Sequence, residues 1–381
     1  MINMNEKTAE ELLDLYFETA DESNGEVSQS EMGKAIGYLK AAADKGLPEA
    51  WAELGACYYN GIGVIKDDKK AIEYMEKAAL RDVANAQMNL YIMMFQNAQT
   101  DEEKRNAFYW LDKAVEQELA SALYEMGTLY YNGLVYKQDF SKAADYYQQS
   151  SDAGSAEAMA MLGAMYQNGQ GFEKDLEKAA ECFTEAAESG SLSGLFNIGA
   201  AYMGGLGVEQ DYEEAVNCFM YIIDLEEPFY LMPDLNDADT RSDIALTFHR
   251  MAVYDLVYPM AHHNLGVIFQ QGLGAEIDKS KALYHFMLAA ENNYAPSCMQ
   301  AGAMLYVGEG HDADYAKAFE YLTAASGAGI NEAKLIISMM YWDGDGVIKD
   351  REKSIALLDE LIAMGNVEAM KAKNELLNSK L

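Results

Sequence analysis

Basic residues are scarce in this sequence. Its 381 residues include only 28 Lys and Arg against 62 Asp and Glu, which gives a formal net charge of −34. Phosphate binding requires clustered Lys and Arg, so we expect no nucleic-acid partner, and an anionic membrane surface would repel the chain. The acidic surface favours solubility, and it also suits a partner that carries basic residues.

Cysteine and histidine are also few. The four cysteines show no C-x-x-C spacing, so neither a zinc ribbon nor a redox motif is predicted, and we expect reduced thiols. None of the five histidines lies in a catalytic triad or in H-E-x-x-H spacing, although His262, His263 and His285 are placed to approach one another. We therefore expect no enzymatic activity, no catalytic residue, no metal and no cofactor.

Long apolar segments are missing as well. The first residues carry acidic side chains where a signal peptide would have its apolar core. The longest apolar runs, such as residues 335–342, are far shorter than the about 18–20 residues that cross a bilayer. The sequence therefore predicts a cytoplasmic protein that does not insert into a membrane.

What the chain does contain is an internal repeat. A marker position recurs every 36 residues, and one step, from 199 to 266, is longer by 31 residues. The marker residues are Gly55, Tyr91, Gly127, Gly163, Gly199, Gly266, Gly302 and Ser338. Self-similarity at a fixed period is typical of solenoids, in which each unit packs on its neighbours and a long chain can share one core.

Each repeat is predicted to form two helices, A and B, as the copy from Ser155 to Gly190 illustrates. Helix A has small residues near the marker, where helices must approach closely. A loop of the form G-x-G-x-x-x-D follows, with an Asp placed to cap helix B, and a glycine stops helix B. Pro48 and Pro259, seven before their markers, predict first turns of A helices. The repeat 83–118 lacks the glycine loop and should have a plainer connection.

The repeated pattern A-x-x-x-L-G-x-x-Y-x-x-G-x-G-V-x-x-D-x-x-K-A-x-x-Y/F-x-x-A-A-x-x-G resembles the Sel1-like repeat family, whose repeats are related to the tetratricopeptide repeat. The resemblance covers most of the chain. It implies an all-α, right-handed α/α superhelical solenoid of about nine 36-residue repeats plus a terminal helix. We expect one solenoid over residues 1–381, with an insertion at 226–256 between repeats. The disulfide pairs of some bacterial members are not expected, since this chain lacks paired cysteines.

The insertion is expected to hold a loop followed by a helix over residues 240–256. One interpretation is that it packs on the solenoid as an extra helix. The other is that it contacts a partner, because loops often carry binding residues. Its contact residues would then be Phe229, Tyr230 and Met232.

The resemblance also implies a binding surface on the concave face, at helix A positions four and five after each marker. The residues at the fourth position are Tyr59, Phe95, Tyr131, Gln167, Met203, Gln270, Tyr306 and Trp342. The amides at the fifth position are Asn60, Gln96, Asn132, Asn168 and Gln271. Rings beside amides suit an extended peptide, since rings bury its side chains and amides pair with its backbone. Alternatively, the rings pack against the neighbouring helix.

By analogy with the family, the sequence predicts a non-enzymatic scaffold or adaptor that binds a protein or peptide. Two alternatives stay open. One is an enzyme or enzyme regulator, including an inhibitor or immunity-type protein, which would need a pocket with converging polar groups. The other is a self-assembling structural protein, which exposed apolar faces on the end helices would favour. The partner's identity and the oligomeric state are not specified by the sequence.

Overall fold

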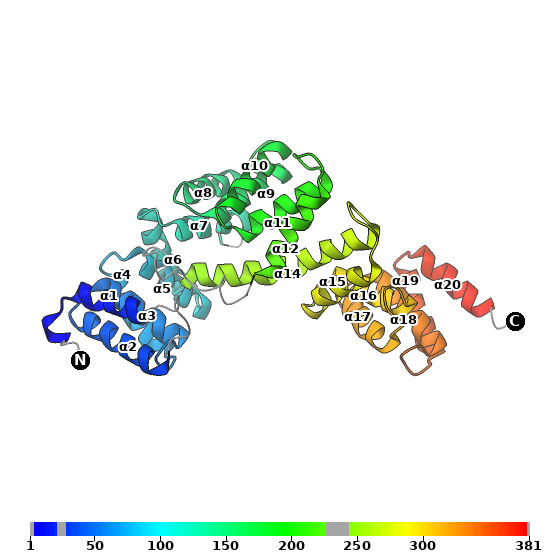
Figure 1. The fold of residues 1–381 in the computed structure, drawn as a ribbon, viewed down its shortest axis with the longest axis horizontal. Helices are drawn as coiled ribbons and strands as arrows, with labels where there is room; N and C mark the ends of the chain where they lie inside the picture. Colours follow the sequence, from blue (N-terminus) through cyan, green and yellow to red (C-terminus); the bar gives the residue numbers. More distant parts are fainter. Residues whose placement is uncertain (1–3, 21–27, 134, 226–243, 379–381) are drawn as a thin grey trace. The chain divides into compact units, whose positions relative to one another are not determined.

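The computed structural model describes residues 4–20, 28–133, 135–225 and 244–378, with side chains given for all of these except 244–250. Over these residues the chain forms 19 α-helices, a short 3-10 helix at Met4–Glu6 and no strand (Figure 1). The predicted all-α fold class is therefore confirmed. In this part of the chain, none of the helices combines the length and apolar character that crossing a membrane requires.

The helices alternate as A and B, and nine pairs are followed by a single terminal helix. The A helices are α1 (Ala9–Ala20), α3 (Pro48–Asn60), α5 (Ala84–Asn97), α7 (Ala120–Asn132), α9 (Ala156–Asn168), α11 (Leu192–Gly204), α14 (Ile244–Gln271), α16 (Ala295–Val307) and α18 (Asn331–Asp343). The B helices are α2 (Gln29–Asp44), α4 (Asp68–Ala79), α6 (Asp101–Glu116), α8 (Phe140–Asp152), α10 (Leu176–Glu188), α12 (Tyr212–Asp224), α15 (Lys279–Glu291), α17 (Tyr315–Gly327) and α19 (Arg351–Ala363). The terminal helix is α20 (Val367–Asn378).

The chain divides into two compact units. The N-terminal unit is Met1–Gly194 together with Glu226–Val253, and the C-terminal unit is Leu195–Leu225 together with Tyr254–Leu381. The helix pairs from α1 to α10 thus belong to the first unit, and those from α15 to α19 belong to the second. That all repeats form one continuous solenoid stays a prediction.

Each marker glycine lies where the two helices of its repeat come closest. A Cβ atom at Gly163 would lie 2.7 Å from ring carbons of Phe183, and one at Gly266 would lie 2.6 Å from Phe286. The facing residue, 20 positions after the marker, is large and fully buried in every repeat; these residues are Met75, Leu111, Tyr147, Phe183, Phe219, Phe286, Leu322 and Leu358. A glycine inside a helix costs about 1 kcal/mol relative to alanine. Burial of these large side chains offsets that cost.

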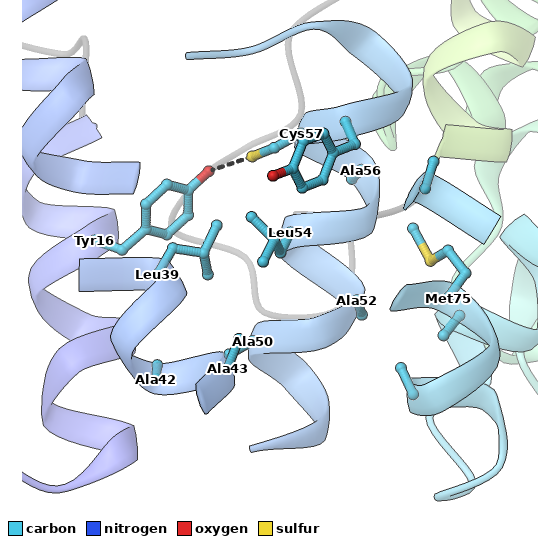
Figure 2. Close-up of a cluster of buried hydrophobic side chains, with 14 of the residues drawn as sticks. Tyr16, Leu39, Ala42, Ala43, Ala50, Ala52, Leu54, Ala56, Cys57 and Met75 are labelled. Atoms are coloured by element: carbon cyan, nitrogen blue, oxygen red, sulfur yellow. Dashed lines mark hydrogen bonds between the residues drawn. The ribbon is translucent and has the colours of Figure 1, made fainter. Parts of the chain in front are cut away.

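The first repeats of the N-terminal unit show how this core is built (Figure 2). Leu39 from α2, Leu54 from α3 and Met75 from α4 are buried in one cluster. Beside them, the hydroxyl of Tyr16 lies 3.5 Å from Sγ of Cys57. Burial raises the pKa of the Cys57 thiol to about 12, so this thiol stays protonated at neutral pH. All four cysteines are free thiols.

The predicted aspartate caps are present in both units. At Asp175, Oδ1 accepts a hydrogen bond from the backbone N–H of Lys178 at 3.1 Å. The aspartates that cap B helices in this way are Asp67, Asp139, Asp175, Asp211, Asp278, Asp314 and Asp350. Such a cap satisfies backbone amides that have no partner within the helix, and it contributes about 1 kcal/mol.

The turn after each B helix requires a left-handed residue. Gly154 and Gly190 have φ angles of 97° and 89° there, as the sequence predicts. Where the repeat has no glycine, Asp82, Glu118 and Asn293 adopt the same conformation with φ of 61°, 57° and 59°. The turn is therefore set by the packing of successive helices, and glycine only lowers its conformational cost.

The connection between α5 and α6 is short, as its missing glycines predict. Three residues, 98–100, separate the two helices. Thr100 and Glu103 form a reciprocal capping box in place of the aspartate cap.

The predicted helix start at Pro259 is wrong. A proline lacks the N–H of a helical hydrogen bond and suits a first turn, which was the reason for that prediction. The structure instead has one helix, α14, that continues through Pro259. Val257 and Ala261 on either side are buried, so tertiary packing holds the turn that the proline weakens. Pro48, in contrast, does lie in the first turn of α3.

Candidate functional site

The predicted contact residues lie at the C-terminal ends of the A helices. We call positions four and five after each marker the helix A face. At the fourth position the half-buried residues are Tyr59, Phe95, Tyr131, Gln167, Met203, Gln270 and Tyr306. At the fifth position the exposed amides are Asn60, Gln96, Asn132, Asn168 and Gln271. Most of these side chains are thus accessible on one side and packed on the other.

Two tyrosines of the helix A face are held by the following repeat. The hydroxyl of Tyr59 donates to Oε1 of Gln96 at 3.2 Å, and that of Tyr131 donates to Oε1 of Gln170 at 2.9 Å. Because each hydrogen bond joins consecutive repeats, the two rings are fixed before any ligand arrives. A side chain that is already ordered loses less conformational entropy on binding.

Two other rings at these positions take part in packing. Phe95 lies against Tyr91 and Phe108, with ring centroids 5.5 and 5.4 Å away. Tyr306 packs edge-on against Tyr315 at 5.7 Å. The alternative of a purely packing role is therefore supported more strongly at Phe95 than at Tyr306, because the Phe95 ring has aromatic neighbours on two helices.

Trp342 is a packing residue and not an accessible one. Its side chain is only 4% exposed, and the guanidinium of Arg351 lies 4.6 Å from its ring centroid. The sequence places it at the same helical angle as Tyr59, but Arg351 at the start of α19 covers it. We therefore remove Trp342 from the proposed contact residues.

A row of buried polar residues on the A helices was missed by the sequence prediction. Glu53, Asn89 and Glu125 lie two positions before the marker in three consecutive repeats. Glu53 and Asn89 are buried, and the hydroxyl of Tyr91 donates to Oε1 of Glu125 at 2.8 Å. Burial and the nearby Glu125 carboxylate raise the pKa of Tyr91. The available signal was a polar residue at one repeat position in three successive copies.

The lysine of the K-A pair has a structural role that the sequence did not reveal. Lys70 Nζ lies 5.1 Å from the centroid of the Tyr58 ring and 3.5 Å from the capping carboxylate of Asp67. Lys178 lies over Tyr166 in the same way. The exposed lysines thus join the loop, the cap and the A helix, and each contact contributes about 1 kcal/mol or less.

The C-terminal unit contains a buried histidine pair. Nδ1 of His262 on α14 lies 2.9 Å from Nδ1 of His285 on α15, and among the residues whose side chains are given Nε2 of His262 has no hydrogen-bond partner. Nδ1 of His263 instead meets the Ser297 hydroxyl at 2.8 Å. Burial, and then the neighbouring His285, lowers the pKa of His262 to about 4; burial, and then Lys281, does the same for His285. Both rings are therefore neutral at pH 7.

An enzymatic or metal site would need polar side chains that converge on one point. Over residues 4–20, 28–133, 135–225 and 251–378, no three His, Cys, Asp or Glu side chains are placed to hold a metal ion. A shallow surface pocket of about 370 Å³ lies by the loop between α7 and α8. Two of its charged side chains already have structural partners, since Lys142 lies over Tyr130 and Asp139 caps α8.

A family model for the Sel1 repeat matches nine segments of the chain: 20–47, 48–83, 93–119, 120–155, 156–191, 192–219, 259–294, 295–330 and 332–366. The chain belongs to the Sel1 repeat family. Sel1 repeats generally mediate protein–protein interactions. The matched segments lie on the nine helix pairs but leave out nearly all of α1, the first nine residues of α5, helix α20 and the insertion. The proposed contacts of the insertion, Phe229, Tyr230 and Met232, lie outside the described residues.

A solved structure gives the same fold. A Sel1 repeat protein from Oxalobacter formigenes is 22% identical, with a TM-score of 0.56 and 88% of each chain covered. A protective antigen with an SLR fold from uropathogenic Escherichia coli is 21% identical, with a TM-score of 0.49, and the match covers 100% of this Sel1 repeat chain and 91% of the antigen. At 22% identity, the similarity to the Oxalobacter formigenes protein concerns the fold alone.

Proposed function

We propose that this Sel1 repeat protein is a non-enzymatic scaffold that binds a protein or peptide along the helix A face of its N-terminal unit. The observation that carries the proposal is the pair of tyrosines, Tyr59 and Tyr131, held in place by amides of the following repeats. Their half-buried rings lie beside the exposed amides of Asn60 and Asn132. This combination repeats at the spacing of the A helices.

The chemistry of these groups suits an extended segment of a partner. Fixed aromatic rings bury apolar or aliphatic side chains at little entropic cost, and exposed amides can donate to and accept from a peptide backbone. The net charge of −34 attracts a segment that contains Lys or Arg and accelerates its association. A basic, partly apolar peptide segment is therefore the partner chemistry that we propose.

The proposal is tested by capturing partners with the native protein from its own cells and measuring the affinity of each purified partner by calorimetry. Replacing Tyr59 and Tyr131 together with alanine should weaken binding at least about tenfold, because both rings are removed from the contact. Helicity should be retained, and the midpoint of thermal unfolding should fall modestly, because each ring loses its hydrogen bond to the following repeat and Tyr131 also loses its contact with Phe140. Raising the salt concentration should also weaken binding.

The matched control removes two tyrosines from B helices. Tyr109 on α6 and Tyr221 on α12 are 54% and 62% exposed, and alanine at both positions should leave the affinity unchanged. Equal binding by the Tyr59→Ala/Tyr131→Ala variant and the wild type would show that the helix A face is not the contact surface. Loss of binding in the Tyr109→Ala/Tyr221→Ala control would indicate that the partner binds to the B helices.

A further inference from the structure

The long helix α14 contains two local defects close to each other (Figure 1). Pro259 lies in the interior of the helix. It has no N–H to donate to the carbonyl of Asp255, four residues earlier, and its ring crowds that carbonyl. Three residues further on, His262 is 2% exposed, and its Nε2 has no hydrogen-bond partner among the residues whose side chains are given. A buried polar atom without a partner destabilises the conformation that contains it.

In the other repeats the chain turns at the place where α14 continues. In the described part of the chain, every other connection from a B helix to the following helix has a left-handed residue nine positions before the marker position. These residues are Gly46, Asp82, Glu118, Gly154, Gly190, Asn293, Gly329 and Gly365. The residue after the turn is the N-cap of the next helix, as Tyr294 is for α16. Tyr258 occupies the equivalent position in α14.

Val257 is the residue of α14 at this turn position. A β-branched residue rarely adopts a positive φ, because its side chain collides with its own backbone there. Val257 is also 3% exposed, and Val253 and Tyr254 beside it are each 8% exposed, so the helical form buries all three side chains. The identity of residue 257 therefore explains why the helix continues up to and through the proline.

A turn at Val257 would supply the hydrogen-bond partner that His262 lacks. In three other repeats, the side chain four positions before the marker donates to the backbone carbonyl eight residues earlier, in the last turn of the preceding B helix. The pairs are Trp51 with Ala43 at 2.9 Å, Gln87 with Ala79 at 3.2 Å and Cys298 with Ala290 at 3.7 Å. For His262 the equivalent acceptor is the carbonyl of Tyr254. In a continuous helix that carbonyl lies about 12 Å away along the axis, out of reach.

We infer that α14 is a two-state hinge, which interconverts between the continuous helix and a form broken at Val257. In the broken form Val257 takes the left-handed turn conformation, and Nε2 of His262 donates to the carbonyl of Tyr254. Pro259 then lies in the first turn of a helix, as Pro48 does in α3, where no N–H is required. The residues before Val257 extend the axis of the A helix in one form and fold back beside it in the other.

Each form contains a conflict between local preference and structure. The continuous helix leaves Pro259 without its hydrogen bond and Nε2 of His262 unpaired, whereas the broken form places a valine in the left-handed region. Because neither form satisfies every local preference, the two are close in free energy and both are populated. A ligand that binds one form better than the other shifts this equilibrium. The hinge does not depend on the partner binding proposed above, which concerns the A helices of the N-terminal unit.

Distances between two spin labels on α14, measured by electron paramagnetic resonance in the full chain, test the inference. The labels are attached at Met251→Cys and Gln271→Cys, both exposed, after the four native cysteines are replaced with alanine. In the continuous helix the labelled positions should lie about 30 Å apart, at about 1.5 Å per residue. In the broken form the two segments run side by side, and the distance should fall to about 15 Å. Val257→Gly should make the shorter distance the main one, because glycine adopts the left-handed turn without strain.

Val253→Gly is the matched control for this measurement. It also replaces a buried valine of α14 with glycine and weakens the helix to a similar extent. Residue 253 does not lie at the turn position of the repeat, so this variant should keep the distance of about 30 Å. A Val257→Gly protein that shows only the longer distance, or a Val253→Gly protein that shows the same shorter one, would overturn the inference.

Hydrogen exchange of the wild type shows whether it visits the broken form. The amides of Met260 and Ala261 donate across the break in the continuous helix, so they should exchange at least about tenfold faster than the amide of Ile268. His262→Leu, which introduces the residue found at the equivalent position 123, cannot donate to Tyr254 and should slow exchange at both amides. Equal exchange at the three amides, or exchange that His262→Leu does not slow, would contradict the hinge.

Discussion

The two units of the molecule build one contact from different side chains. In the N-terminal unit, Tyr58 and Tyr74 stack with ring centroids 5.8 Å apart. In the C-terminal unit, Phe269 and His285 stack at 5.6 Å at the same two repeat positions. A lysine lies over the first ring in both cases. The repeat thus conserves a packing geometry while it allows the second ring to be a phenol or an imidazole.

Because the second ring is a tyrosine in one unit and a histidine in the other, the two units respond differently to acid. Phenols stay neutral across the acidic range, so the stacked tyrosines of the N-terminal unit do not titrate there. His285 does titrate, and burial of the two imidazoles, which is the main cause, makes protonation of His285 and of His262 unfavourable in the folded state. The comparison therefore predicts the same packing role for these residues in both units. It also predicts a loss of stability between about pH 6.5 and 5 that arises from the histidine pair of the C-terminal unit.

The largest expected effect concerns the close packing of the A and B helices at the marker glycines, which the two units share. Gly163→Val in the N-terminal unit and Gly266→Val in the C-terminal unit should each lower the free energy of unfolding by about 3 kcal/mol. The reason is the same in both units, because the new side chain would overlap a fully buried phenylalanine. Chemical denaturation followed by circular dichroism measures the change.

The control for these variants is a helical glycine without close neighbours. Gly37 in α2 has nothing within 4 Å of an added Cβ, so Gly37→Ala should stabilise the protein by up to about 1 kcal/mol. If Gly163→Val and Gly266→Val were tolerated as well as Gly37→Ala, close A–B packing would not be the reason for the marker glycines.

An intermediate effect concerns the His262–His285 pair, which distinguishes the C-terminal unit from the N-terminal unit. The folded pKa of His262 and His285 is about 4, whereas the unfolded value is about 6.5. The unfolded chain therefore binds more protons between these pH values, and stability that is fully present above pH 6.5 is lost as the pH falls toward 4. At pH 5, the proton that one of these histidines binds on unfolding should lower the free energy of unfolding by about 2 kcal/mol.

Hydrogen exchange of α14 and α15 against that of α3 and α4, at pH 7.5 and 5, would locate this loss in the C-terminal unit. Replacing the pair with the residues at the equivalent positions of the α7–α8 repeat, which are Leu123 and Tyr146, gives His262→Leu and His285→Tyr; this variant should lose most of the pH dependence. Equal acid destabilisation of the two units, or an unchanged pH dependence in the variant, would refute the role of the pair.

The smallest effect concerns the lysines. Lys70→Met should cost at most about 1 kcal/mol, because an exposed cation over a ring contributes little. Lys281→Met should cost a similar amount and should also raise the pKa of His285, since the positive charge of Lys281 lowers it. A histidine titration followed by NMR distinguishes the two variants, and an unmoved His285 pKa in Lys281→Met would contradict this assignment.

The sequence predicted those features that are local and repeated. The marker glycines, the aspartate caps and the glycine turns depend on residues within one repeat, so their spacing alone identifies them. Features that depend on neighbouring elements were not predictable. The position of Trp342 on its helix does not indicate that Arg351 from the next helix covers its ring. The presence of Pro259 likewise does not indicate that the packing of its neighbours keeps α14 helical on both sides of the proline. The contact of His262 with His285 likewise depends on how two helices meet.

Binding of a partner along the helix A face is the central claim, and site-specific photo-crosslinking tests it most directly. A photoreactive amino acid at Asn132, on the helix A face of α7, is compared with one at Gln148, which is exposed on the B helix of the same repeat. We predict that the captured partner crosslinks from position 132 and not from position 148. Crosslinking from position 148 alone would contradict the account.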